Sequence, residues 1–286
     1  MEMPARLLKQ NHAMKYLNVS GYRFVPIDNL SELQVHMLAA LREADVLGTI
    51  LIAEEGINVA LSAPAESIAK VRQWFDTDER FAGLWLKESW SELQAFTKLK
   101  VRIRPEIITF NGQHAVGSEG RKHAPPITPE TLKTWLDEGR DFVLLDTRND
   151  YEIRSGTFKK AVDVDLVNFR DFPEVAAAAV ASGEIPTDKP VVTFCTGGIR
   201  CEKAAPFLSA AGVREVYQIE GGILNWFEKY GAEHWDGDCF VFDDRHVITP
   251  LLEETNSWLC RVCNTARPEG VTCDCQSGNR SAAETV

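Results

Sequence analysis

The sequence predicts an α/β protein with two domains and a small cysteine-rich segment toward its C-terminal end. Three observations lead to this prediction: strands and helices in the order β-α-β-β-α-β near the N-terminus, a second strand–helix alternation further on, and four cysteines after residue 259. A chain of 286 residues is long enough for two domains of ordinary size. We expect these three units, with a polar glycine- and proline-rich linker at 117–126, over residues 1–116, 125–235 and 236–286.

Apolar residues at strand and helix spacing predict the elements of the first domain. The leader before them, residues 1–18, is expected to lie on the surface or form a helix. The expected strands cover residues 22–26, 48–53, 58–61, 84–89 and 99–103. The expected helices cover residues 32–44, capped by Asp28 or Ser31, and 64–75. On the first helix we expect an apolar face of Leu33, Val35, Met37, Leu38 and Leu41. This order matches a ferredoxin-like or acylphosphatase-like α+β sandwich, a fold that by itself assigns no chemistry.

Basic side chains alternate along the last strand of this domain and therefore project from one face. They are Lys98, Lys100, Arg102 and Arg104. With Arg121 and Lys122 they give six basic residues against Glu106 and Glu119, a local positive excess in a chain of net charge −11. Lysines on an exposed edge strand ordinarily discourage pairing with other strands, and contact with phosphate groups is the alternative interpretation.

The second domain centres on a cysteine in a glycine-rich loop. An apolar strand at 190–194 precedes Cys195, and a helix is expected from 202 to 211 with Gly212 after its end. The loop between them consists of Thr196, Gly197, Gly198 and Ile199, followed by Arg200. Backbone N–H groups in such a loop and the positive end of the helix dipole stabilise an anion, and we expect Arg200 to add charge at the rim. This pattern predicts a lowered pKa and a nucleophilic thiolate at Cys195.

Loop length and the second cysteine narrow the chemistry. A cysteine phosphatase places five residues between its cysteine and arginine, whereas here Arg200 comes one place early and Cys201 is the sixth residue after Cys195. The tighter loop suits the outer sulfur of a cysteine persulfide. Cys201 would either resolve an oxidised intermediate by forming a disulfide or only pack under the loop. A purely structural Cys195 is the non-catalytic alternative, but it explains neither the glycines nor Arg200.

Polar residues follow the buried strand at 142–146. We expect Asp146, Arg148 and Glu152 to lie near the cysteine loop, because polar groups at the carboxyl ends of parallel strands share one edge of the sheet. We expect these three residues to satisfy one another's charges rather than to react.

Cysteine usage and the lack of targeting, membrane and cofactor motifs in the sequence exclude several classes of protein. Seven cysteines, two of them in one loop, do not form a disulfide framework, so a reducing cytoplasm is expected. The sequence has no signal segment, no apolar run of membrane-spanning length, and no haem, flavin or nucleotide motif.

Near the C-terminal end, a zinc site is predicted from four thiols in a C-x₂-C and C-x-C pattern, with a reduced tail as the alternative. These are Cys260, Cys263, Cys273 and Cys275.

Three motifs together resemble a known family. They are Glu55-Gly56-Ile57-Asn58, the segment Cys-Thr-Gly-Gly-Ile-Arg-Cys-Glu-Lys-Ala at 195–204, and Asp-Gly-Asp-Cys-Phe-Val-Phe-Asp-Asp-Arg at 236–245. The second motif alone resembles rhodanese active loops, a resemblance that covers about residues 125–235, although the usual Gly-His-Ile-Pro-Gly-Ala segment is altered at 156–161. The set of three, from about Tyr22 to Arg245, resembles the rhodanese-related tRNA uridine hydroxylases.

The resemblance implies hydroxylation of the wobble uridine, position 34 of tRNA, to 5-hydroxyuridine, with molecular oxygen as co-substrate and Cys195 as the required residue. The implied partner is the anticodon loop of tRNA, which gives the basic strand a role as an RNA contact. Two other classes of function stay open: a sulfurtransferase that carries a persulfide on Cys195, and a regulatory rhodanese module, a class that often lacks the cysteine.

Overall fold

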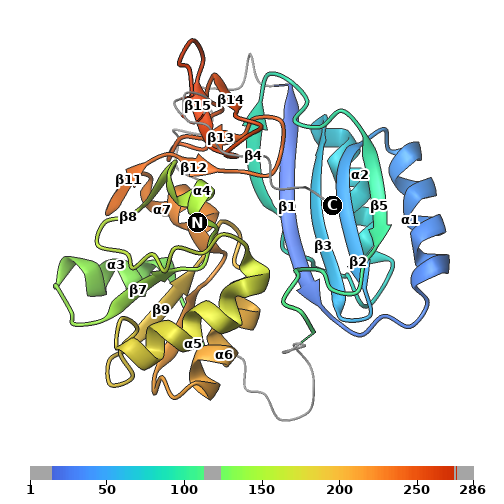
Figure 1. Ribbon diagram of the computed structural model, residues 1–286. Coiled ribbons are helices and arrows are strands. Elements are labelled where there is room, and N and C mark those ends of the chain that lie inside the picture. The colour runs from blue at the N-terminus through green and yellow to red at the C-terminus, as the bar shows by residue number, and fades with distance from the viewer. Residues whose placement is uncertain (1–14, 113–123, 274, 276–286) are drawn as a thin grey trace.

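The computed structural model describes residues 15–112, 124–273 and 275, in which an α+β domain lies beside an α/β domain (Figure 1). A C-terminal segment packs across the top of both. Residues 1–14 of the expected leader, most of the expected linker, and Arg121 and Lys122 lie outside the described residues. Each helix among the described residues is too short or too polar to cross a membrane.

The first domain has the predicted α+β order, with one five-stranded sheet. Its elements are β1 (Tyr16–Phe24), α1 (Leu30–Glu43), β2 (Leu47–Ala53), β3 (Gly56–Ala63), α2 (Ala65–Asp76), β4 (Lys87–Ser91) and β5 (Leu99–Ile103). The strand order is β4-β1-β3-β2-β5, and only the β2–β5 pair is parallel. The first strand begins at Tyr16, inside the expected leader, because alternate residues from Leu17 onward are buried in the core.

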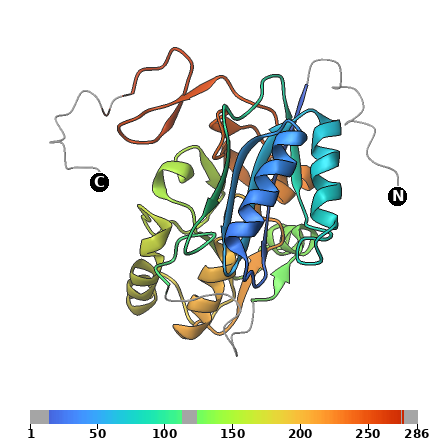
Figure 2. The same cartoon turned by 90° about the vertical axis from the view of Figure 1, so that its right-hand side faces the viewer.

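Both helices of this domain cover one face of the sheet (Figure 2). Met37 of α1 and Phe75 of α2 are buried against Val19 and Leu61, so this face forms the core. Two details of the predicted first helix are wrong. Val35 is 64% exposed because it lies on the outer side of α1, and the residue before the helix is Asn29 rather than Asp28 or Ser31.

The second domain has a parallel four-stranded sheet in the order β6-β10-β9-β7. Its elements are β6 (Pro126–Ile127), α3 (Pro129–Asp137), β7 (Val143–Asp146), α4 (Asp150–Ile153), β8 (Gly156–Phe158), a 3₁₀ turn (Phe169–Asp171), α5 (Phe172–Ser182), β9 (Val191–Phe194), α6 (Cys201–Ala210), β10 (Val216–Ile219) and α7 (Gly222–Tyr230). Leu208 of α6 belongs to one apolar cluster and Trp226 of α7 to another, so each face of the sheet has its own core.

The C-terminal segment links the two domains. Its strands are β11 (Trp235–Gly237), β12 (Cys239–Phe240), β13 (Val247–Ile248), β14 (Ser257–Leu259) and β15 (Ala266–Pro268). Strand β11 pairs with β8 of the second domain. Arg245 forms an ion pair with Asp243 and donates a hydrogen bond of 2.8 Å to Ser89 of β4 in the first domain. The motif at 236–245 therefore fixes the first domain against the second.

A buried lysine makes a second link between the domains. Nζ of Lys203 on α6 lies 2.9 Å from Glu55 and 3.2 Å from Glu106, and it donates a hydrogen bond to the carbonyl oxygen of Ile108. Glu55 comes from the turn between β2 and β3. Since removing one partner of a buried ion pair costs several kcal/mol, these contacts hold the domains in one arrangement.

Candidate active site at the domain interface

Cys195 lies where β9 ends and the chain turns into α6. Its sulfur accepts a hydrogen bond of 3.2 Å from the N–H group of Gly198, whose φ of +98° favours glycine. Behind the loop, the N–H of Ile223 bonds to the carbonyl oxygen of Cys195. A Cβ atom at Gly222 would lie only 2.4 Å from that same oxygen, so the loop requires glycine at this position.

The surroundings of Cys195 favour the thiolate although the residue is only 1% exposed. Burial opposes ionisation, but a hydrogen bond from Cys201, the charge of Arg200 and backbone N–H groups of Arg200 and Gly198 outweigh it. Together they lower the pKa of Cys195 to about 6. At neutral pH most of the Cys195 thiol is therefore ionised, the form in which a cysteine can act as a nucleophile.

Arg200 was expected at the rim of the loop, but it lies inside the protein. Its side chain is 5% exposed and forms a two-pronged ion pair with Glu152, at 2.9 Å and 2.8 Å. The expectation that Glu152 pairs with Asp146 and Arg148 is therefore wrong. Those two residues pair with each other at 2.6 Å, Arg148 also donates a hydrogen bond to the carbonyl oxygen of Gly156, and Asp146 accepts one from Thr157.

Cys201 is the first residue of α6 and is completely buried. Burial and the neighbouring Cys195 both raise the pKa of the Cys201 thiol, so it stays protonated and donates its hydrogen bond to the Cys195 sulfur. The Thr147 hydroxyl lies 3.8 Å away on its other side. The two cysteines are therefore neighbours in space, as their spacing in the loop predicts.

The first domain also contributes side chains to the cysteine site, which sequence reasoning missed. The Tyr22 hydroxyl of β1 donates a hydrogen bond of 3.0 Å to Glu202 of α6, and a Cβ at Gly198 would lie 3.0 Å from that hydroxyl. Lys87 of β4 is buried, and its Nζ atom lies 5.3 Å from the centre of the Tyr22 ring and 4.6 Å from the centre of the Trp85 ring. Trp85 in turn lies against Gly221, in the turn behind the loop. Neither Tyr22 nor Lys87 belongs to a motif, so only the packing of the domains identifies them.

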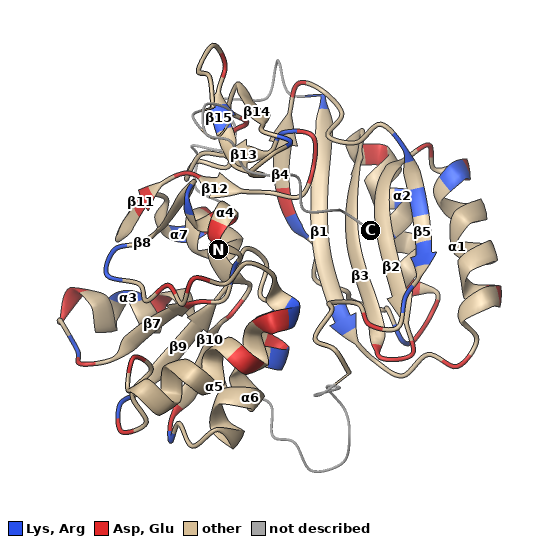
Figure 3. Ribbon diagram, in the orientation of Figure 1, with Lys and Arg blue, Asp and Glu red and all other residues tan. Residues whose placement is uncertain are grey.

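The predicted basic strand is β5, at the edge of the first sheet (Figure 3). Lys98, Lys100, Arg102 and Arg104 are all exposed. Pairing across the sheet places Lys100 in one row with Lys87, through the intervening residues Thr49, Ala60 and Ser20. Residues paired in this way share a face, so the exposed basic edge and the buried Lys87 lie on the same side of the sheet. Strand β5 is four strand spacings, roughly 19 Å, from β4, the strand that carries Lys87 at the cysteine site. The basic edge therefore does not itself border Cys195.

The four C-terminal cysteines come together around β14 and β15. Their sulfur atoms all lie within 4.8 Å of one another, and the Cys260–Cys275 and Cys263–Cys273 pairs are each 3.5 Å apart. This cluster has the donor set of a metal-binding site.

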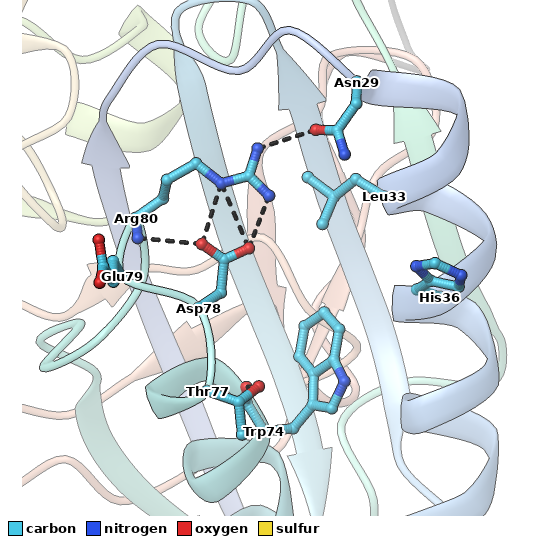
Figure 4. Close-up of a pocket in the computed structure, with 8 residues that line it drawn as sticks. All are labelled: Asn29, Leu33, His36, Trp74, Thr77, Asp78, Glu79 and Arg80. Atoms are coloured by element: carbon cyan, nitrogen blue, oxygen red, sulfur yellow. Dashed lines mark hydrogen bonds and ion pairs between the residues drawn. The ribbon is translucent and has the colours of Figure 1, made fainter.

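A surface hollow of about 590 Å³ lies away from these sites, between the ends of α1 and α2 (Figure 4). Arg80 spans it, bonded to both carboxylate oxygens of Asp78 and to Asn29. The hollow is on the helix side of the sheet, whereas Tyr22 and Lys87 project from the other side. The charges of Arg80 and Asp78 in the hollow are paired with each other, and we assign the hollow no role in the chemistry of Cys195.

Comparison with known proteins adds two domain matches and a set of relatives. A family described as "UPF0176 acylphosphatase like domain" matches residues 16–107, and the rhodanese-like domain family matches residues 128–229. The tRNA uridine(34) hydroxylase of Cupriavidus necator is 46% identical over 255 residues, which cover 87% of this chain and 89% of that protein. The proteins of that name from Ralstonia nicotianae and Xanthomonas oryzae pv. oryzae are 44% and 45% identical. They cover 87% and 82% of this chain, and 89% and 93% of their own lengths.

Proposed function

The chain belongs to the tRNA uridine(34) hydroxylase family, and we propose that it converts uridine 34 of tRNA to 5-hydroxyuridine with Cys195 as the reacting residue and molecular oxygen as co-substrate. One oxygen atom enters the base, and the other leaves as water with two electrons from an external reductant. The observation that carries the assignment of Cys195 is its ionised thiol, held in a glycine loop at the interface between the two domains. Since tRNA is the substrate and none of the seven cysteines forms a disulfide, we place the reaction in the cytoplasm.

Cys195, Arg200 and Cys201 have distinct proposed roles. The Cys195 thiolate contacts the uracil ring, and the N–H groups of the loop keep its sulfur ionised. Arg200 supplies positive charge from a fixed position because Glu152 holds its guanidinium group. Cys201 would stabilise the thiolate through its hydrogen bond and would either resolve an oxidised Cys195 by forming a disulfide or only pack under the loop.

Two assays distinguish the proposed activity from sulfur transfer. Total tRNA from a strain lacking the gene should contain no 5-hydroxyuridine, and expression of the chain should restore it, as measured by mass spectrometry of the nucleosides. The purified protein should transfer sulfur from thiosulfate to cyanide only slowly. Rapid sulfur transfer by a protein that does not restore the nucleoside would instead establish a sulfurtransferase.

We further propose that the exposed basic strand β5 binds phosphates of the anticodon stem. Reversing two charges, in the double variant Lys100→Glu and Arg102→Glu, should weaken tRNA binding by about tenfold or more. The plot of log affinity against log salt should become shallower by roughly 1.5, since about two phosphate contacts are lost. Fluorescence anisotropy with labelled tRNA over a range of salt concentrations measures both quantities.

The control is the double variant Arg42→Glu and Lys70→Glu. It makes the same charge change at exposed positions on α1 and α2, which cover the other face of the sheet. Both variants should keep the wild-type Tm. Equal weakening in the two variants would mean that only net charge matters, and no weakening in the first would leave the basic strand as a solvated sheet edge.

We propose that the four C-terminal thiolates hold one structural zinc ion, because a Cys₄ donor set is typical of structural zinc sites. Native mass spectrometry should find one zinc per chain, and a strong chelator should lower the Tm while leaving the Cys195 loop intact. A Cys239→Ser variant, whose cysteine is outside the cluster, should keep the metal. A metal-free native protein with four freely alkylated thiols would contradict the proposal.

A further inference from the structure

Two lysines are buried at the domain interface, and their surroundings differ. Lys203 is surrounded by two carboxylates and a carbonyl oxygen. Lys87 is 7% exposed, and within the described residues it makes no ion pair and no hydrogen bond through its side chain. Its ammonium group lies over the rings of Tyr22 and Trp85. A largely buried ammonium group that lacks an anionic or hydrogen-bonding partner is costly, so an acceptor supplied by a ligand would be favourable here.

Tyr22 connects the ammonium group of Lys87 to the Cys195 loop. The ammonium group lies 5.3 Å from the centre of the Tyr22 ring, and the Tyr22 hydroxyl lies against Gly198, whose N–H group bonds to the Cys195 sulfur. Burial lowers the pKa of Lys87 to about 8, and the negative charges of Cys195 and Glu202 oppose that shift. The groups that face it are therefore Cys195 on the loop, Glu202 on α6 and the Tyr22 hydroxyl on β1, which is itself bonded to Glu202. At neutral pH most of the Lys87 population remains protonated, so Lys87 is a hydrogen-bond donor on the side of the loop that Tyr22 covers.

Trp85 adds an aromatic surface next to this lysine. Its side chain is 46% exposed, although its ring contacts both Lys87 and the Gly221 turn that supports the cysteine loop. Exposed aromatic rings are the usual stacking surface for unpaired RNA bases. Trp85 therefore presents an exposed aromatic ring next to the turn that supports the cysteine loop.

We propose that the first domain supplies the base-binding half of the active site. In this arrangement Lys87 donates a hydrogen bond to a carbonyl oxygen of the uracil held over Cys195, and Trp85 stacks on an unpaired base of the anticodon loop. The inference rests on the proposed function for the identity of the base. A site shared between the domains explains why the acylphosphatase-like domain is fixed to the rhodanese-like domain through Lys203 and Arg245. Neither domain alone would hold a complete site.

The test compares Lys87→Met, which keeps the length of the side chain but not its charge, with Lys87→Arg and with Lys70→Met as an exposed control. Lys87→Met should form 5-hydroxyuridine at least 100-fold more slowly, with a Tm equal to or above that of the wild type because an unpaired buried charge is removed. Lys87→Arg should recover part of the activity, and Lys70→Met all of it. The thiolate absorbance at 240 nm, taken as the difference from Cys195→Ser, should show a higher Cys195 pKa in Lys87→Met.

Stacking is tested separately with an anticodon stem-loop RNA that carries uridine at position 34. Trp85→Leu should bind it roughly 5- to 100-fold more weakly, whereas Trp85→Phe should stay close to the wild type. Wild-type turnover in Lys87→Met together with wild-type RNA binding in Trp85→Leu would overturn the inference. So would a Lys87→Met variant that loses activity only in proportion to a fall in Tm, with the Cys195 pKa unchanged.

Failure of the proposed function gives a different result. If the wild type forms no 5-hydroxyuridine but Trp85→Leu still loses stem-loop binding and Lys87→Met still raises the Cys195 pKa, the proposed reaction is wrong and the base-binding site stands.

Discussion

Replacing Cys195 with alanine is expected to reduce formation of 5-hydroxyuridine by on the order of 10³-fold or more, because the reacting thiolate is removed. The fold should survive. The side chain is buried but small, and its loss should shift the Tm by only a few degrees. Nucleoside mass spectrometry of tRNA treated with the variant, together with its thermal melting curve, measures the two effects.

The matched control for this variant is Cys239→Ala, another completely buried cysteine that lies outside the loop. It should have a similar effect on Tm and little effect on activity. The pH profile gives a second check. Since the pKa of Cys195 is lowered to about 6, wild-type activity should be retained above that value and lost as the pH falls through it. A Cys195→Ala variant with more than trace activity would contradict the assignment.

The second large effect is expected from Arg200→Ala. This change leaves Glu152 charged and buried without its partner, which typically costs about 3–5 kcal/mol. It also removes a charge that holds the Cys195 thiolate, so the pKa of Cys195 should rise and less thiolate should be present at neutral pH. Both a lowered Tm and an acid limb of the activity profile shifted to higher pH are expected.

Two further variants separate these causes. Arg200→Lys keeps the charge but loses the planar fork, so it should restore the thiolate better than it restores the stability. Arg72→Ala breaks an exposed ion pair with Glu88, which should cost at most about 1 kcal/mol and leave the thiol unchanged. An Arg200→Ala variant with the wild-type Tm and Cys195 pKa would show that the buried pair has neither role.

The sequence allowed the fold and the cysteine loop to be predicted because both depend on local patterns. Glycines beside Cys195 and alternating apolar residues each act within a few positions of the chain. The hydrogen bond from the Gly198 N–H group to the Cys195 sulfur is an example that the structure confirms. The order of elements in the first domain was predicted correctly for the same reason.

The partners of charged side chains could not be predicted in this way. Arg200 was expected at the rim, but it turns toward Glu152 because a buried guanidinium group needs a carboxylate, and sequence spacing does not say which one. Lys87 and Trp85 belong to no motif, and they approach Cys195 only because Lys203 and Arg245 fix one domain against the other. The distance of β5 from Cys195 likewise depends on the order of strands in the sheet.

The central claim is that uridine 34 is bound between the two domains, with its base over Cys195. The most direct test is a photo-crosslinking experiment with tRNA that carries 4-thiouridine at position 34, followed by mass spectrometry of the crosslinked peptides. We expect crosslinks to the Cys195–Arg200 loop or to the peptide that contains Trp85 and Lys87. Crosslinks confined to other surfaces, such as the hollow around Arg80, would contradict the claim.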